Sequence, residues 1–265
     1  MPSDSAGAAS ARADGATVLL PRPSAGRTFA SSRRVRLSDT TPTGVLRLDA
    51  LGRYIQDIAT DDARETMTGR YLAWVVRRCV MEVTSAPTSE EMCELTTWCA
   101  GYGSRWAERR TSLVGSRGGR CESVVLWVAV DTKTGAPARL PDSFHDSYGE
   151  AHAGRKVSAR LQHGSPPSHA DPTEWQFREA DMDRLGHVNN AAYWTIVEER
   201  YRSHERPSAF RAEVEYRDPT VAGAGLQILE YQPDMWVVDG SGDTKASFRV
   251  NEIETAAAES PTLRR

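Results

Sequence analysis

Apolar side chains recur with helical spacing in one segment near the start of the chain. Between residues 48 and 66 they follow the i, i+3, i+4, i+7, i+8 repeat of a helix that buries one face. The repeating positions are Leu51, Tyr54, Ile55, Ile58 and Ala59. Asp49 lies where a helix favours an N-cap residue. The pattern therefore predicts a helix over 48–66 that begins at an Asp49 cap.

Four strand-like segments follow this helix. They are rich in β-branched and aromatic residues, are separated by clusters of Gly and Pro, and span 72–84, 93–102, 105–115 and 121–132. Consecutive strands with short turns usually pair with their neighbours along the chain. The first half of the protein is therefore predicted to be one helix packed on an antiparallel meander.

The same order of elements returns in the second half. A short strand at 175–178 and a helix at 190–203 precede three strands, which we expect at 210–216, 227–239 and 245–254. A helix followed by a sheet, found twice, predicts two similar α+β domains.

Polar, Gly-rich and Pro-rich stretches divide the chain. Residues 1–27 have too few large apolar groups to offset the entropy of ordering and are predicted to be a disordered leader. Residues 142–172 resemble an interdomain linker, and 255–265 a polar tail. The predicted domains are then an N-terminal domain at 28–141 and a C-terminal domain at 173–254.

Composition narrows the classes of function. A net charge of -3 lacks the cationic excess that nucleic-acid binding needs. The longest apolar run, residues 124–130, is far shorter than the roughly 20 residues of a membrane span, and the N-terminal residues do not resemble a secretory signal. Four Cys without a CxxC pair and scattered His predict reduced thiols and no metal site. We therefore expect a soluble, cytoplasmic protein.

The most informative stretch combines a loop carboxylate, a glycine and a polar helix start. Asp183 is followed by Gly186, which permits close backbone approach to a ligand, and by Asn189 and Asn190, either of which can cap the next helix. Free N–H groups in the first turn of a helix stabilise negative charge on a carbonyl oxygen. Asp183 can then act as a nucleophile or as a base for water.

The string D-x-x-G-H-V-N-N-x-x-Y over 183–193 is similar to the signature of hotdog-fold thioesterases. The chain over 29–251 resembles the tandem-hotdog fatty acyl-acyl carrier protein thioesterases of plants and bacteria. Further matches are the helix segment RLDALGRYIQDIATDDA, the strand at 74–78, the strands through Trp98 and Trp127, Leu140-Pro141 and Glu215-Tyr216-Arg217. The resemblance implies an α+β fold of two hotdog domains, each a long central helix wrapped by a curved antiparallel sheet.

The resemblance also assigns site residues. Asp183 and His187 match catalytic positions of the plant-type enzymes. Leu185 stands in place of the family's Asn, and Pro219 and Thr220 replace its Glu and Cys. The plant-type network is therefore incomplete, and a simpler set of a carboxylate and a helix N-terminus remains.

We therefore expect hydrolysis of fatty acyl thioesters carried by acyl carrier protein or coenzyme A, without a cofactor. The thioester carbonyl is predicted to face N–H groups over 188–190, which makes Gly186, Val188, Asn189 and Asn190 the expected binding residues beside the catalytic Asp183 and His187. Leu51, Tyr54, Ile55 and Ile58 of the first helix are expected to line the acyl-chain pocket.

Several alternatives stay open at this point. The three missing polar groups also fit a binding or regulatory module that lost the reaction, and a hotdog dehydratase is a weaker third reading. Glu198 or Glu199 can supply a helix carboxylate, and arginines at 33–36, 77–78 and 105–110 can form a docking face for acidic acyl carrier proteins. Pairing of the two sheets within one chain allows a monomer, and a homodimer is the alternative.

Overall fold

The computed structural model describes residues 17–66, 72–201 and 207–254. Its helices are α1 Leu48–Glu65, α2 Asp142–His152 and α3 Trp194–Arg200, with 3-10 turns η1 Leu37–Asp39, η2 Glu179–Asp181 and η3 Asn190–Tyr193. Its strands are β1 Phe29–Arg34, β2 Leu72–Ser85, β3 Met92–Tyr102, β4 Trp106–Gly115, β5 Arg120–Asp131, β6 Asp171–Trp175, β7 Phe210–Tyr216, β8 Leu226–Tyr231, β9 Asp234–Asp239 and β10 Thr244–Glu252. The predicted α+β class is confirmed.

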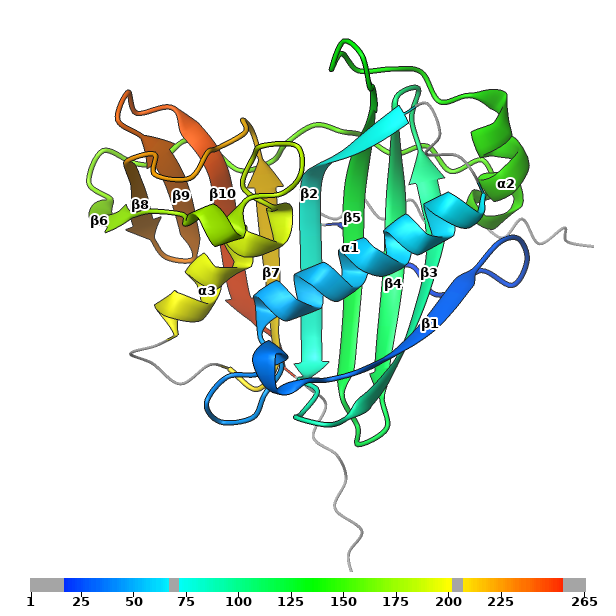
Figure 1. Ribbon diagram of the computed structural model, residues 1–265, viewed down its shortest axis with the longest axis horizontal. Helices are drawn as coiled ribbons and strands as arrows, with labels where there is room; N and C mark the ends of the chain where they lie inside the picture. The colour runs from blue at the N-terminus through cyan, green and yellow to red at the C-terminus, as the bar shows by residue number, and fades with distance from the viewer. Residues whose placement is uncertain (1–16, 67–71, 202–206, 255–265) are drawn as a thin grey trace, which may run out of the picture.

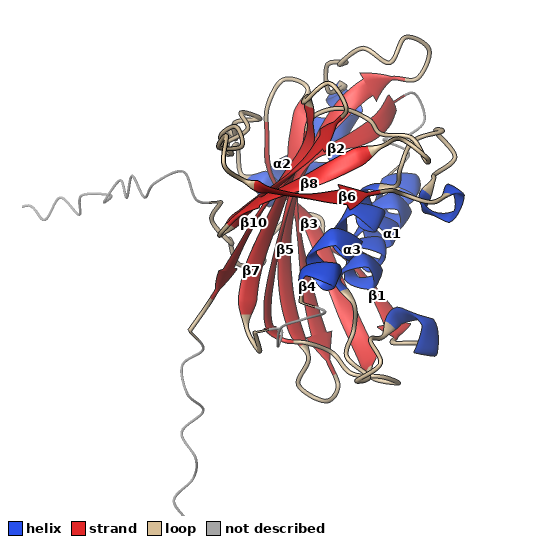
Figure 2. Cartoon of the chain, turned by 90° about the vertical axis from the view of Figure 1, so that its left-hand side faces the viewer, coloured by secondary structure: helices blue, strands red, loops and turns tan. Residues whose placement is uncertain are grey.

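All described strands belong to one antiparallel sheet with the order β1-β3-β4-β5-β2-β7-β10-β9-β8-β6. The sheet curves around the helices, and α1 and α3 lie against the same face (Figures 1 and 2). The first five strands wrap α1 and the last five wrap η3 and α3. A helix wrapped by a curved antiparallel sheet therefore occurs twice, as predicted.

The helix predicted at 48–66 is confirmed as α1, but its cap differs from the prediction. The N-cap is Arg47, and Asp49 lies inside the first turn. The Asp49 carboxylate accepts hydrogen bonds from Arg47 Nε at 2.8 Å and from Arg53 Nη1 at 2.7 Å. These two guanidinium groups hold its pKa below the usual value despite partial burial. Asp49 is therefore bound to side chains and does not cap the helix.

The four strands predicted in the first half are confirmed as β2 to β5, but their pairing differs. β3, β4 and β5 form the meander, whereas β2 pairs with β5 and not with β3. β1 was not predicted, since its sequence FASSRR has no sustained alternation of apolar and polar residues. It pairs with β3, with Phe29 opposite Thr97 at one end and Arg34 opposite Met92 at the other, and forms an edge of the sheet.

The two halves are joined by antiparallel pairing of β2 with β7. Arg78 faces Glu215 across this pair, and the register runs to Val83 opposite Phe210. Because β2 also pairs with β5 and β7 with β10, the sheet is continuous from one half to the other. The chain thus makes internally the edge-to-edge contact that was expected between hotdog domains.

The second half departs from the prediction at two elements. The expected helix at 190–203 is the turn η3 followed by a seven-residue α3 that ends at Arg200, while 202–206 lies outside the described residues. The expected strand at 227–239 is a hairpin of β8 and β9, because Pro233 interrupts it with a turn. The short strand expected at 175–178 lies earlier, at β6.

The N-terminal part of α1 packs against α3. Glu198 Oε1 accepts a hydrogen bond of 2.6 Å from the backbone N–H of Leu48, one of the donors that a helix leaves unpaired at its start. A Cβ atom on Gly52 would lie 3.1 Å from Trp194, so glycine lets the helices approach closely. Glu198 therefore ties the two halves together and does not line the large cavity described below.

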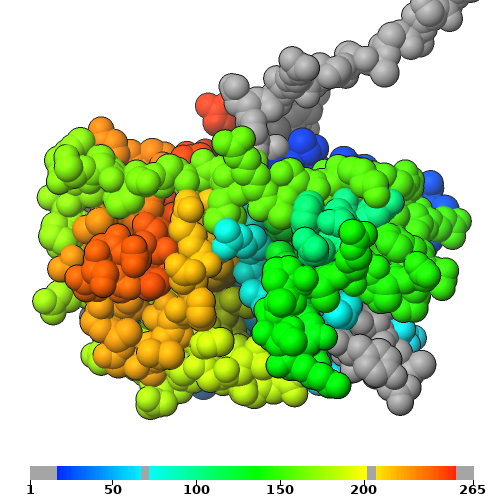
Figure 3. All heavy atoms as spheres, turned by 90° about the horizontal axis from the view of Figure 1, so that it is seen from above, coloured from blue at the N-terminus to red at the C-terminus, as the bar shows by residue number. Residues whose placement is uncertain are grey.

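The segment predicted to be a linker is largely structured. α2 buries Phe144 and Tyr148 in a small apolar cluster with Cys99 and Leu140. Residues 153–170 then cross the outer face of the sheet from one half to the other (Figure 3). Trp106 Nε1 donates to Val157 O at 2.9 Å, and Trp236 Nε1 donates to Gly164 O at 2.8 Å. Hydrogen bonds from both halves thus fix this segment.

Part of the predicted leader is structured as well. Arg27 Nε lies 2.7 Å from the buried carboxylate of Asp62 on α1, and Arg27 Nη2 lies 2.5 Å from Glu65. The prediction of disorder for residues 1–27 is therefore wrong for the end of that segment, because an ion pair anchors it. Residues 1–16 and 255–265 lie outside the described residues.

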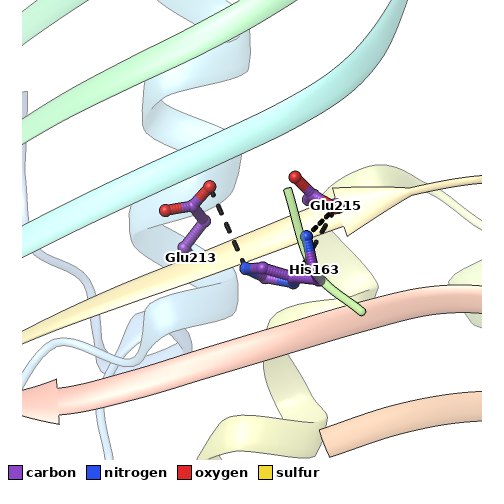
Figure 4. A group of neighbouring side chains, drawn as sticks. All are labelled: His163, Glu213 and Glu215. Carbon is purple, nitrogen blue, oxygen red and sulfur yellow. Dashed lines mark hydrogen bonds and ion pairs between the residues drawn. The ribbon is translucent and has the colours of Figure 1, made fainter. Parts of the chain in front are cut away.

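His163 lies at the centre of the contact between the crossing segment and the sheet (Figure 4). The buried Glu215 accepts backbone N–H bonds from Gln162 at 2.5 Å and from His163 at 3.0 Å. His163 Nδ1 lies 3.0 Å from Ser247 Oγ, and its Nε2 lies 4.0 Å from Glu213 Oε1. These contacts come from three chain segments, so the cluster pins the crossing segment to β7 and β10.

The same three side chains are the group that most resembles a metal site among the described residues. Ligand atoms of His163, Glu213 and Glu215 lie within 4.8 Å of one another. Glu215 already binds two backbone N–H groups, and Nδ1 faces Ser247. This leaves His163 Nε2 and Glu213 Oε1, fewer than the three or four protein ligands typical of zinc. We assign the cluster a structural role.

Acidification is expected to weaken this contact. Burial lowers the pKa of His163 below 6.5, although the nearby Glu215 and Glu213 act in the opposite direction. The unfolded chain then binds more protons, so the contribution of His163 to stability is present above about pH 6.5 and is lost as pH falls through the folded pKa. Urea unfolding from about pH 7.5 to about pH 5 should show a smaller loss of stability in His163→Gln than in the wild type. Equal losses of stability in both proteins would contradict this assignment. Burial also lowers the pKa of His152, but this residue is present in both proteins and therefore does not affect the comparison.

Candidate active site

A cavity of about 1340 Å³ is lined by residues of both halves. The first half contributes one side of α1, the start of β2, parts of β4 and β5, and α2. The second half contributes the loop at 183–188, the start of η3 and the end of β7. Asp183, His187, Val188 and Asn190 therefore face the same space as α1 and α2. This volume exceeds the roughly 300–1,000 Å³ of most ligand pockets.

α1 presents to the cavity a different face from the one that we predicted. Its lining residues include Gln56, Ala59, Thr60 and Ala63, whose small or polar side chains leave room beside the helix. Leu51, Tyr54, Ile55 and Ile58 instead pack in the main core. Of these four, Ile55 borders a small second pocket near Trp194, and none lines the large cavity. The helical repeat located the side of α1 that packs in the core, and the cavity lies along another side.

The loop that carries Asp183 is a tight turn. Asp183 N donates to His187 O at 2.8 Å, and Gly186 N donates to Asp183 O at 3.1 Å. Gly186 has φ of 78°, a conformation that glycine adopts without strain. Asp183 Oδ1 accepts the N–H of Leu185 at 2.7 Å, while Oδ2 has no hydrogen-bond partner among the described residues. One carboxylate oxygen therefore orients Asp183, and the other remains free to act on a ligand.

His187 and Gly186 have different places in this loop. The His187 side chain is exposed and lines the cavity, and within the described part of the chain its ring makes no hydrogen bond. Gly186 does not line the cavity, so its role is to shape the turn. Asp183 and His187 thus reach the same cavity from opposite ends of one turn.

Backbone donors at the start of η3 are fewer than predicted. Val188 N donates to Thr220 O and Asn189 N donates to Asp181 O, both at 2.8 Å. The Asn189 side chain caps η3 by accepting the N–H of Ala191 at 2.8 Å. Asn190 N has no acceptor among the described residues. Of the donors predicted at 188–190, only the Asn190 N–H is therefore unoccupied.

Asn190 is held in place from β7. Its carbonyl accepts a hydrogen bond of 2.8 Å from Tyr216 Oη, and burial raises the pKa of Tyr216 well above its ordinary value, so the hydroxyl stays protonated. Arg77 Nη1 donates to Tyr216 O at 2.8 Å and to Arg217 O at 3.1 Å. A guanidinium from the first half therefore fixes the strand end that positions the donor in the second half.

Two of the three residues that depart from the expected pattern, Leu185 and Pro219, line the same cavity. Leu185 is 56% exposed and, with Pro219, lines the cavity. Thr220 is buried, and its carbonyl accepts the Val188 N–H. Neither Leu185 nor Pro219 brings a polar side chain toward Asp183. Within the described residues, this part of the cavity thus contains a carboxylate, a histidine and one backbone donor without an acceptor.

Most of the arginines considered as a docking face are buried, paired or inside the cavity. Arg78 and Arg110 are buried, and Arg110 Nη2 lies 2.8 Å from Glu122. Arg109 Nη1 lies 2.6 Å from the buried Asp62. Arg77 and Arg105 line the cavity. Burial and pairing thus remove much of the charge that the sequence had suggested for a docking surface.

The fold and the site define the class of protein. Two hotdog units joined edge to edge enclose one cavity with a carboxylate beside a helical turn, an arrangement suited to acyl-thioester hydrolysis. Residues 26–148 match the model of the acyl-ACP thioesterase N-terminal domain, and residues 164–258 match that of the C-terminal domain. The chain belongs to the acyl-ACP thioesterase family, whose members are thioester hydrolases. Among the described helices, none is long and apolar enough to cross a membrane.

Individual relatives agree with this placement. An uncharacterised protein of Mycobacterium tuberculosis is 31% identical over 218 residues, which covers 82% of this chain and 87% of that protein. The chloroplastic oleoyl-acyl carrier protein thioesterase 1 of Arabidopsis thaliana is 27% identical over 168 residues, covering 56% of this chain and 46% of its own length. The mycobacterial match, at 82% of the chain, extends over both halves.

Two solved structures share the fold. The 12:0-ACP thioesterase from Umbellularia californica superposes with a TM-score of 0.66 at 22% identity and covers 84% of this chain and 96% of its own. An acyl-ACP thioesterase from Bacteroides thetaiotaomicron gives 0.67 at 15% identity, with the same coverage of 84% and 96%. At these identities the likeness establishes the tandem-hotdog fold.

Replacing Arg77 tests the link between the two halves. Arg77→Met removes both hydrogen bonds to the end of β7, so Asn190 should be less well positioned, and kcat for thioester hydrolysis should fall about tenfold or more with a smaller change in KM. Steady-state kinetics on an acyl-thioester series measure this split. Arg36→Met, an exposed arginine outside the cavity, is the control. An unchanged kcat in Arg77→Met would show that the β7 end needs no support from β2.

Proposed function

We propose that this protein hydrolyses fatty acyl thioesters and releases free fatty acid from acyl carrier protein. The observation that carries the proposal is the free Oδ2 of Asp183 and the free N–H of Asn190 in one cavity that also extends along α1 to α2. The Asp183 oxygen and the Asn190 N–H suit the thioester group, and the remainder of the cavity suits an acyl chain.

In the proposed mechanism, the thioester carbonyl oxygen accepts the Asn190 N–H, and His187 lies at the same mouth as a second donor. Asp183 Oδ2 takes a proton from water, whose oxygen attacks the carbonyl carbon. The tetrahedral intermediate then expels the thiolate, which takes the proton held by Asp183 and leaves as the thiol, and the free fatty acid remains. A preorganised oxyanion donor contributes about 10²–10³ in rate and a positioned base about 10²–10⁴.

Acyl carrier protein is the proposed carrier because the chain belongs to the acyl-ACP thioesterase family. Arg105, Arg184 and Arg217 line the cavity and suit the phosphate of a pantetheine arm, which coenzyme A also has. Measuring turnover of one acyl chain on each of the two carriers distinguishes acyl carrier protein from coenzyme A.

We further propose a cytoplasmic monomer, since all four Cys are free and buried and the β2–β7 pairing joins the sheets within one chain.

A second candidate is an acyl-thioester binding module without turnover. The occupied donors of Val188 and Asn189, together with Leu185 and Pro219, favour it because they leave the oxyanion site with one backbone donor. Against it, Asp183 is half-buried, lines the cavity and has one carboxylate oxygen without a hydrogen-bond partner among the described residues. A binder of a neutral thioester does not require such a carboxylate. Tight binding without release of thiol would identify this alternative.

Asp183→Asn tests the proposed function. The amide keeps the shape and a carbonyl oxygen that can accept the Leu185 N–H, but it is neither a base nor a nucleophile, so turnover should fall by about 10²–10⁴ with little change in thermal unfolding. Thiol release from dodecanoyl-acyl carrier protein is the assay. Asp171→Asn, an exposed acid in β6, is the matched control. Wild-type turnover in Asp183→Asn would refute the mechanism.

A further inference from the structure

The part of the cavity lined by the first half includes a charged cluster, although an acyl-chain site is expected to be apolar. Arg109 and Tyr148 both line the cavity. Arg109 Nη1 and Tyr148 Oη contact the same oxygen of Asp62 at 2.6 and 2.8 Å, and the guanidinium carbon lies 5.2 Å from the centre of the Tyr148 ring. A buried charge cluster therefore borders the space that the chain enters.

The position of this cluster follows from the sheet and α1. β4 lies three strands from β7, a distance of about 14 Å at the usual strand spacing. Along α1, Asp62 lies ten residues beyond Gly52, which packs on η3, a rise of about 15 Å. With carbon–carbon bonds of about 1.5 Å, an extended chain advances about 1.3 Å per carbon. An acyl chain of roughly twelve carbons therefore reaches Arg109.

Arg109 has hydrogen-bond donors that the protein does not use. Its described hydrogen bonds all come from Nη1, which donates to Asp62 and, at 3.5 Å, to Thr97 Oγ1. Within the described residues, Nε and Nη2 have no acceptor, while the side chain is 11% exposed and lines the cavity. A hydrocarbon end placed there removes water from these donors without replacing the hydrogen bonds, which is unfavourable.

The charge of the cluster indicates which acceptor fits. Asp62 is 1% exposed and pairs with both Arg109 and Arg27, and Arg27 also pairs with Glu65. Two carboxylates and two guanidinium groups leave the cluster neutral. An uncharged oxygen then fits better than a carboxylate, since the charge of Arg109 is already balanced.

We propose that the distal end of the cavity recognises acyl chains of about twelve carbons that carry a hydroxyl or oxo oxygen at or near their far end, with Arg109 as the residue that determines this specificity. The inference rests on the proposed function, since it defines the substrate class of the same cavity. Chains too short to reach Arg109 are unaffected by it.

Binding of free fatty acids tests this without any need for turnover. Isothermal titration with dodecanoate and 12-hydroxydodecanoate should show tighter binding of the hydroxylated acid by about tenfold, the effect of one net hydrogen bond to a charged group. In Arg109→Met the ratio should fall to about one, whereas Arg36→Met, which changes an exposed arginine outside the cavity, should keep the wild-type ratio. If thermal unfolding shows that Arg109→Met does not fold, Arg109→Lys, which keeps the charge, replaces it. Arg109→Lys should reduce the ratio of the two affinities.

The kinetics of the two corresponding acyl-carrier-protein thioesters complete the experiment. A higher kcat/KM for the hydroxylated chain that depends on Arg109 supports the inference. Equal or weaker binding of 12-hydroxydodecanoate by the wild type, or a ratio unchanged in Arg109→Met, overturns it even if both thioesters are hydrolysed. Arg109-dependent preference in binding with no hydrolysis of either thioester supports the distal site and instead refutes the proposed function.

Discussion

The antiparallel pairing of β2 with β7 is the contact on which the rest of the structure depends. It merges two curved sheets into one and sets the Asp183 loop of the second half beside the cavity along α1. Further contacts across the same boundary reinforce it: Glu198 caps α1, Arg77 holds the end of β7, and residues 153–170 cross the outer face. Each half therefore completes the site of the other, and neither holds the whole site by itself.

This division explains how one fold can serve two tasks. The second half supplies a rigid turn in which one oxygen of Asp183 is fixed by a backbone N–H and the other remains free. The first half lengthens the cavity, because α1 and strands β2, β5 and β4 line the part of it beyond that turn. In the proposed function, the chemistry lies in the second half and chain recognition in the first, so a change at Arg109 is expected to leave Asp183 undisturbed.

Local patterns predicted much of this from the sequence. The helical repeat gave α1, alternation gave most strands of the first half, and the motif at 183–193 gave the loop and the family. Prediction failed where the outcome depends on contacts distant in sequence. β2 pairs with β5 because the meander folds back on it, and the polar segment 142–172 is ordered because Glu215 and two tryptophans bind its backbone.

The same limit applies to the site. The sequence predicted the Asp183 carboxylate. It did not predict that the carbonyl oxygens of Thr220 and Asp181 accept the N–H groups of Val188 and Asn189, since those acceptors lie in other turns. It also placed the acyl pocket on the most apolar face of α1, the face most suited to the core and therefore already filled. The polar far end was hidden because Asp62, Arg109 and Tyr148 come from three separate elements.

The most direct test of the account is a crystal structure of the Asp183→Asn protein with a dodecanoyl thioester of pantetheine bound. The account predicts the carbonyl oxygen within hydrogen-bond distance of Asn190 N, residue 183 beside the carbonyl carbon, and the chain running along α1 toward Arg109. A chain bound in the second half alone, or a thioester group remote from residue 183, would contradict it.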